Sequence, residues 1–139
     1  MPPPTAEAHS LPPPDLLAQQ SDWLAPARAR LLRRVQIAQR RSVLDLGCGW
    51  QTVTAELARR SSGTVVAADS SRRVFAAQVS DQASGLRVCC DAVQLPFRPE
   101  SFDLVFCQFA LLWFDVAAAI CEIRRVLAPG GKLVALEPD

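Results

Sequence analysis

The stretch that decides the fold is residues 43–52, which read VLDLGCGWQT. A short apolar run leads into two glycines one residue apart, and a helix-compatible segment begins near Thr52. Glycine permits the sharp turn between a strand and a helix, where backbone N–H groups can meet a nucleotide-like ligand. Where many such loops carry a third glycine, this one carries Gln51, preceded by Trp50. If Gln51 needs a positive φ, we expect strain of about 1 kcal/mol or more.

The composition favours one globular domain without a strong charge preference. The 139 residues are 50% hydrophobic and carry a formal net charge of +1. This balance gives no global attraction to nucleic acid or membrane, so we expect no nucleic-acid partner. The first residues, MPPPTAEAHSLPPPD, lack the basic flank and apolar centre of a signal peptide, and no apolar stretch is long enough to span a bilayer. We therefore expect a cytoplasmic protein.

The five cysteines predict core thiols and no metal site. They are odd in number, form no CxxC pair and mostly stand in apolar runs, where a reduced thiol behaves as a small hydrophobic group. Cys89 and Cys90 would point to opposite faces of a strand, which makes joint metal ligation awkward. His9, the single histidine, lies in a proline-rich segment, and we do not expect it to be a base or a ligand.

Two segments precede the glycine loop. Residues 1–14 carry two triple-proline clusters, and we expect an extended, disordered tail. Residues 15–40 form an expected helical segment, in which Pro26 is tolerable only in a first turn. Its apolar positions recur at three- and four-residue steps and are Trp23, Leu24, Ala27, Leu31 and Val35.

A dense basic group accompanies this helical segment. Its members are Arg28, Arg30, Arg33, Arg34, Arg40 and Arg41. Steering of an anionic substrate or an RNA is one interpretation, but a nucleic-acid reader usually has a wider basic surface with aromatic support. A solvated helix face is the interpretation we favour.

The remaining chain alternates between strand and helix signals. Strands are expected at 42–46, 64–69, 86–90, 102–108 and 132–137, and helices at 52–60, 71–82 and 115–127. Apolar strands that alternate with helices predict an α/β fold, with a parallel sheet covered on both faces. Ligands of such sheets bind beyond the carboxyl ends of the strands.

Several residues with useful chemistry fall at these carboxyl ends. Gly47 and Gly49 allow close backbone approach to a ligand. Asp45 can accept an N–H of the loop or face a cation of the ligand, and Asp69 can accept hydrogen bonds from ribose hydroxyls. Asp91 can accept a proton of an exocyclic amine. Each carboxylate taken alone can instead cap a helix or form a turn.

The motifs in this order resemble the class I methyltransferases that depend on S-adenosylmethionine, in particular the ubiquinone and menaquinone biosynthesis branch. The similar stretches are VLDLGCG (43–49), VVAADSS (65–71), DAVQLPFRPESFDLVFC (91–107) and EIRRVLAPGGKLVALEP (122–138). The resemblance covers residues 41–139, the expected cofactor-binding core. It implies a Rossmann-like doubly wound parallel sheet with strand order 3-2-1-4-5.

The same resemblance implies S-adenosylmethionine as the cofactor. Asp69 is then the ribose-binding acid, Asp91 and Ala92 meet adenine, and Gln108 lies close to the ligand. The full set of implied cofactor-binding residues is Asp45, Gly47, Cys48, Gly49, Trp50, Asp69, Ser70, Asp91, Ala92 and Gln108.

The implied reaction is methyl transfer to a small-molecule acceptor, which depends mainly on alignment and exclusion of water. No catalytic base can be named. Trp113 and Phe114 are candidate walls of an acceptor pocket, or else core residues, and Glu137 and Asp139 are weaker candidates for acceptor contacts. Two alternatives stay open: a cofactor-binding module without catalysis, and an NAD-dependent oxidoreductase, which the glycine pattern alone would also fit.

The chain stops at the fifth predicted strand, whereas members of the resembled family usually continue into a sixth and a seventh. The fifth strand would then be an edge with unpaired backbone groups, which proteins normally cover or pair. We expect either a piece of a longer methyltransferase or a domain that completes its sheet with a partner chain or in a homodimer.

Overall fold

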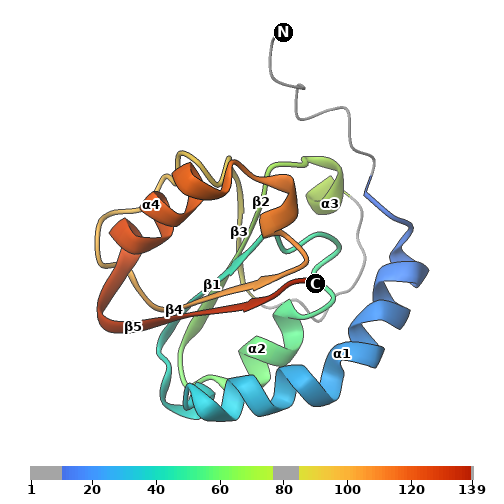
Figure 1. Ribbon diagram of the computed structural model, residues 1–139, viewed down its shortest axis with the longest axis horizontal. Helices are drawn as coiled ribbons and strands as arrows, with labels where there is room; N and C mark the ends of the chain where they lie inside the picture. The colour runs from blue at the N-terminus through green and yellow to red at the C-terminus, as the bar shows by residue number, and fades with distance from the viewer. Residues whose placement is uncertain (1–10, 77–84, 139) are drawn as a thin grey trace, which may run out of the picture.

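The computed structural model describes residues 11–76 and 85–138 and contains one parallel sheet. The strands are β1 (Ser42–Leu46), β2 (Thr64–Asp69), β3 (Leu86–Cys89), β4 (Phe102–Gln108) and β5 (Leu127–Leu136). Their order across the sheet is β3-β2-β1-β4-β5, and each neighbouring pair is parallel (Figure 1). The predicted fold and strand order are confirmed, and the described residues hold no strand beyond β5.

The helices connect the strands and cover both faces of the sheet. They are α1 (Pro14–Arg34), η1 (Ile37–Gln39), α2 (Thr54–Arg60), α3 (Arg73–Ala76), η2 (Leu111–Trp113) and α4 (Val116–Val126). Figure 1 shows α1 and α2 on one side of the sheet and α4 on the other. The predicted helix 71–82 corresponds to α3, and the part of that prediction over 77–84 lies outside the described residues.

Alternation along the strands builds one apolar core on each face. Leu44, Val66 and Val105 pack with α4 on one face, whereas their strand neighbours Val43 and Val65 pack on the other face, with α1 and α2. Successive side chains of a strand point to opposite faces, so three central strands supply both cores at once. This double burial explains why their sequences are continuously apolar.

The α1 helix differs from its prediction in two ways. Pro26 lies inside the 21-residue helix and not in a first turn. Because proline lacks an N–H, it cannot donate to the carbonyl of Asp22 in the preceding turn. The buried face is formed by Ser21, Arg28 and Leu32, while Trp23 is 81% exposed. The expectation of a solvated face is therefore wrong for Arg28.

The β5 strand begins earlier than predicted. Leu127 pairs with Phe102 directly after α4, and the register then shifts, so that Leu104 faces Lys132. The Pro-Gly-Gly segment lies in this irregularity and is not a separate turn before the strand. The pairing of Leu127 with Phe102 of β4 thus extends β5 beyond the apolar run from which the strand was predicted. The other strand ends agree with prediction to within one residue.

The cysteines are less uniformly buried than predicted. Cys48 and Cys107 are buried, but Cys89 and Cys121 are exposed. All five are free thiols, and within residues 11–76 and 85–138 no group of three or more His, Cys, Asp or Glu side chains could hold a metal ion. In the same part of the chain, every helix is too short or too polar to cross a membrane.

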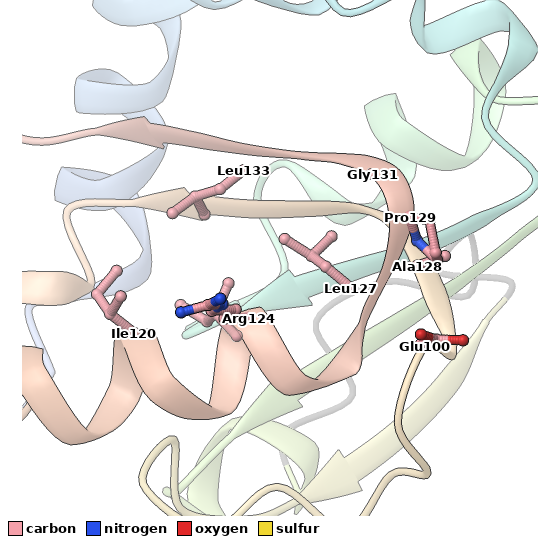
Figure 2. Close-up of a pocket in the computed structure, with 9 residues that line it drawn as sticks. Glu100, Ile120, Arg124, Leu127, Ala128, Pro129, Gly131 and Leu133 are labelled. Carbon is pink, nitrogen blue, oxygen red and sulfur yellow. The ribbon is translucent and has the colours of Figure 1, made fainter.

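One open groove lies between α4 and the edge strand β5. Its volume is about 430 Å³, and Figure 2 shows Ile120, Leu127 and Leu133 around it, with Arg124 and Glu100 at its border. Glu100 precedes β4 by two residues, and Leu127 and Ala128 begin β5, so the groove lies toward the amino-terminal ends of these strands. The groove therefore lies apart from the predicted cofactor crevice at the carboxyl ends.

Candidate cofactor-binding site

The glycine loop is tied to the end of β2 by its own N–H groups. Gly47 N and Cys48 N donate to the carbonyl of Ala68 at 2.8 and 3.0 Å, and Gly49 N donates to Asp69 Oδ2 at 2.9 Å. Gly47 has a φ of +71°, and a Cβ there would stand 2.5 Å from the Cβ of Ala110. The loop therefore needs glycine for close packing, and these three donors are engaged within the protein.

Gln51 adopts the positive φ that the loop pattern suggested, with a value of 61°. Its Oε1 is buried and has no hydrogen-bond partner within the described part of the chain. A left-handed backbone and an unsatisfied buried oxygen both cost free energy. Gln51 is therefore a strained position in the loop.

Trp50 and the segment before α1 contact each other. The indole Nε1 of Trp50 donates to the carbonyl of Pro12 at 2.9 Å. A Cβ built on Gly49 would lie 3.7 Å from Leu11 and 3.8 Å from Leu17. The end of the expected disordered tail is thus packed over the glycine loop, which corrects the prediction for residues 11–14. Residues 1–10 of that tail lie outside the described residues.

Asp69 accepts hydrogen bonds from two loops. Its Oδ2 accepts from Gly49 N, and its Oδ1 accepts from Ser71 N, each at 2.9 Å. Each carboxylate oxygen has a second lone pair for a further donor. Ser70 is exposed at the same strand end, and its carbonyl accepts a weak hydrogen bond from Cys89 Sγ at 3.5 Å. Asp69 therefore stabilises the turn after β2, which was the alternative role for this carboxylate. Its oxygens can still accept further hydrogen bonds from a ligand.

Asp45 is buried at the carboxyl end of β1. Its Oδ2 accepts a hydrogen bond from Thr54 Oγ1 at 2.7 Å, so the hydroxyl of α2 and not a loop N–H is its partner. Burial raises the pKa of Asp45 to about 7, and the charge of Asp69 adds to this, against the lowering by the Thr54 hydrogen bond and the Arg28 charge. A cation beside Asp45 would favour its charged form.

Asp91 and Ala92 begin the connection after β3. Asp91 is exposed, and its Oδ1 accepts from Val93 N at 3.1 Å, while Ala92 is buried in the core. Asp91 thus stabilises a turn and still faces solvent. The connection continues to Leu95, which is anchored on α4.

Gln108 ends β4 and is held by Arg28, a member of the basic group that we expected on a solvated helix face. Arg28 Nη1 donates to Gln108 Oε1 at 3.1 Å, and Arg28 Nε donates to Glu56 Oε2 at 2.7 Å. The available signal was helical spacing, because Arg28 precedes Leu32 by four residues on one helix face. The structure thus brings α1 and α2 to the crevice.

The candidate acceptor residues lie beyond β4 and β5. A Cβ on Gly47 would stand 3.3 Å from Phe114 Cζ, so Phe114 lies beside the glycine loop, whereas Trp113 is 56% exposed. Glu137 Oε1 accepts from Ala110 N and Leu111 N at 3.2 and 3.1 Å. Asp139 lies outside the described residues.

The fold and the site define a class of proteins: doubly wound α/β domains with a polar crevice at the carboxyl ends of parallel strands. Residues 44–135 match the family model described as a methyltransferase domain. The chain belongs to this family.

Similar proteins support the same family. The chain is 38% identical over 122 residues to a demethylmenaquinone methyltransferase of Mycobacterium marinum, covering 87% of this chain and 50% of that protein. It is 38% identical over 112 residues to a malonyl-[acyl-carrier protein] O-methyltransferase of Halorhodospira halophila, covering 76% and 38%. A solved S-adenosylmethionine-dependent methyltransferase of Mesorhizobium loti matches with a TM-score of 0.66 and 25% identity, over 76% of this chain and 51% of that one. The chain thus spans half or less of the length of these curated relatives.

Proposed function

We propose that this domain binds S-adenosylmethionine and transfers its methyl group to a small-molecule acceptor. The proposal rests on one observation: the loop's N–H donors are already paired within the protein, whereas carboxylate acceptors line the crevice. Gly47, Cys48 and Gly49 donate their N–H groups within the protein, while Asp45, Asp69 and Asp91 offer carboxylate oxygens. This set suits a ligand with hydroxyls, amines and a positive charge.

The same set is poorly suited to a dinucleotide. A pyrophosphate at a glycine loop is bound by backbone N–H groups at the start of a helix. The N–H groups of the glycine loop itself, on residues 47–49, already have acceptors within the protein, and Asp45 and Asp69 would lie near the phosphates. The NAD-dependent oxidoreductase is therefore the less favoured alternative, because the carboxylates would repel a pyrophosphate and the loop has few N–H groups left to bind it.

The residues fit S-adenosylmethionine by the chemistry of their donors and acceptors. Asp69 would hold the ribose hydroxyls beside Ser70, Asp91 and Ala92 would meet the adenine, and Asp45 would face the ammonium group. Cys48, Trp50 and Gln108 would complete the walls of the crevice. The bound cofactor supplies an electrophilic methyl group on a sulfonium, which already contains the leaving group.

The protein's own contribution is alignment and exclusion of water. Leu11 and Leu17 pack over Gly49, and Phe114 packs beside Gly47, so apolar side chains border the loop on two sides. An acceptor that enters beyond β4 and β5 would meet Phe114 and Glu137. We infer a cytoplasmic location as part of this proposal, supported by five free thiols, which suit a reducing compartment.

Titration calorimetry with S-adenosylmethionine and with NAD tests the proposal. We expect heat with S-adenosylmethionine, none with NAD, and loss of binding in Asp69→Ala. Asp22→Asn, a change at an exposed position of α1, is the matched control and should bind like the parent chain. Absence of S-adenosylmethionine binding would refute the proposal, and binding without turnover across an acceptor panel would favour the non-catalytic module.

A further inference from the structure

The outward face of α1 presents apolar side chains to solvent. Trp23 is the most exposed large apolar side chain of the described residues, at 81%, and Leu16 is 55% exposed. The two are seven residues apart, which places them within about 20° of each other around a helix. Arg30 and Arg34 continue the same line, seven and eleven residues after Trp23, and both are exposed. One line of α1 thus carries two apolar side chains and then two arginines.

Further arginines gather beside the carboxyl end of α1. Arg40 Nε donates to the carbonyl of Val35 at 2.8 Å, which holds the segment before β1 against this helix end. Ser62 N donates to the carbonyl of Arg40 at 2.9 Å and brings the end of α2 to the same corner. The exposed arginines of this basic corner are Arg30, Arg33, Arg34, Arg41 and Arg59. Within the described residues, none of the five forms an ion pair.

The carboxylates near the basic corner do not balance it. Glu56 of α2 is already paired with two other arginines. Asp103 accepts hydrogen bonds from the N–H groups of residues 41 and 42, at 2.9 and 3.1 Å. Asp15 and Asp22 are exposed too, but they lie in the amino-terminal half of α1. The corner therefore has a local excess of positive charge that the net charge of +1 does not reveal.

The combination of side chains suits the surface of a lipid bilayer. Tryptophan is enriched at the level of the lipid headgroups, and arginine places its stem along apolar surface while its guanidinium binds phosphate. Leu16 adds an apolar side chain that could enter the acyl boundary but offers no ring on which a nucleic-acid base could stack. Figure 1 shows α1 at the periphery of the molecule, where a whole side of the helix is accessible.

We propose that the outward face of α1, together with the basic corner, binds the surface of a bilayer that contains anionic lipids. The helix would lie along the interface, with Leu16 and Trp23 among the headgroups and the arginines on lipid phosphates. This inference does not depend on the proposed function, because lipid binding can be measured without cofactor or acceptor. It also accounts for the exposure of Trp23, which the helical spacing alone had placed on the apolar side.

Sedimentation with lipid vesicles tests the proposal. The chain should bind vesicles of phosphatidylcholine that also contain phosphatidylglycerol, bind pure phosphatidylcholine much less, and dissociate at high salt. The double change Arg30→Gln and Arg34→Gln should weaken binding about tenfold or more, since each arginine near an anionic surface contributes about fivefold. The matched control is Arg87→Gln with Arg98→Gln, which removes the same charge from exposed positions outside α1 and the basic corner.

The tryptophan is tested in the same assay. Trp23→Ala should weaken vesicle binding about fivefold or more, whereas Trp113→Ala, a change at an exposed tryptophan after β4, should not. Urea unfolding should show that the variants keep the stability of the parent, because all the changed side chains are exposed.

Three results would overturn the proposal. The first is no binding of the parent chain to the anionic vesicles. The second is an equal loss in the two arginine double variants, which would mean that only the overall charge matters. The third is tighter binding to single-stranded poly(U) RNA than to the vesicles, which would make this face a nucleic-acid surface. Cofactor binding is decided separately by calorimetry, so failure here leaves the proposed function standing.

Discussion

Asp45 is the residue whose charge is most strongly affected by its surroundings. It is buried, it accepts a hydrogen bond from Thr54, and burial is the largest cause that raises its pKa to about 7 from 3.8. Asp69 and Arg28 are the charged groups that act on it, with opposite effects. The folded protein therefore holds a proton on Asp45 at pH values where the unfolded chain has released it.

This raised pKa predicts that stability falls as the pH rises from about 4 to about 7. Below pH 4 both states are protonated and the contribution is complete, and it is lost as the pH passes the folded-state value. Urea unfolding of the parent and of Asp45→Asn across this pH range measures the contribution of Asp45 to the free energy of unfolding. We expect the difference in the free energy of unfolding between the parent and the variant to change by a few kcal/mol over this range, because each pKa unit corresponds to about 1.4 kcal/mol. Parallel curves would contradict the raised pKa.

Gln51 predicts a stabilising substitution. Gln51→Gly removes a left-handed non-glycine residue, which costs about 1–2 kcal/mol, and a buried oxygen without a partner, which costs about 1–3 kcal/mol. Glycine in turn loses about 0.5–1 kcal/mol through backbone entropy. We expect a net gain of about 1 kcal/mol or more in the free energy of unfolding, and tighter binding of S-adenosylmethionine.

A matched control for this change is Gln36→Gly. Gln36 also has a positive φ, of 55°, but its side chain is exposed. It should therefore show the backbone gain without the gain from the buried oxygen. A Gln51→Gly chain no more stable than the Gln36→Gly chain would argue that the Gln51 amide is satisfied in solution.

At the scale of elements, α4 holds the connection that carries Asp91 and Ala92. Glu122 of α4 accepts from Leu95 N at 2.7 Å and from Arg125 at 2.8 and 2.9 Å, and Arg125 donates to the carbonyls of Leu95 and Phe97. The Arg125 and Leu95 hydrogen bonds lower the pKa of Glu122 to about 2. The helix thus fixes the loop that we assign to adenine.

Glu122→Gln should loosen this attachment. The amide keeps the size of the carboxylate but loses its charge, and the loss of charge-assisted hydrogen bonds should lower the free energy of unfolding by about 1–3 kcal/mol. Urea unfolding measures this, with Glu100→Gln as an exposed control. The difference from the parent should persist above about pH 4.5 and shrink as the pH falls toward about 2, where Glu122 itself becomes protonated. A pH-independent difference would contradict the ionic attachment.

At the scale of the whole molecule, β5 is an edge strand beside the apolar groove of Figure 2. It pairs only with β4 in the described sheet, and its other edge leaves backbone groups without strand partners. Such edges pair readily with another chain unless they are covered or charged. We propose that further polypeptide, from this protein or a second copy, completes the sheet here.

This edge predicts concentration-dependent self-association of the chain. Size-exclusion chromatography with light scattering should give a mass that rises with concentration. Ala135→Lys, a charge at an exposed position of β5, should keep the chain closer to the monomer, whereas Ala135→Ser should not. A stable monomer of the parent chain at high concentration would refute this prediction.

Much of the fold followed from local pattern. The ends of β1, β2 and β4 agree with the predicted ranges because each is an apolar run closed by polar or glycine residues. Parallel order follows from the alternation of strands with helices, and the positive φ at Gln51 follows from its place in the loop. In each case the information lies within about ten residues of the position concerned.

The hydrogen bonds within the candidate site join residues that are far apart in the sequence, and the sequence did not predict them. Arg28 and Gln108 are 80 residues apart, so helical spacing could place Arg28 on the same face as Leu32 but could not show that its guanidinium reaches Gln108. The same holds for the bonds from the glycine loop to Ala68 and Asp69, and for the register shift that lengthens β5. Periodicity reports which face of an element is apolar, whereas a hydrogen bond between distant elements exists only once packing has brought its donor and acceptor together.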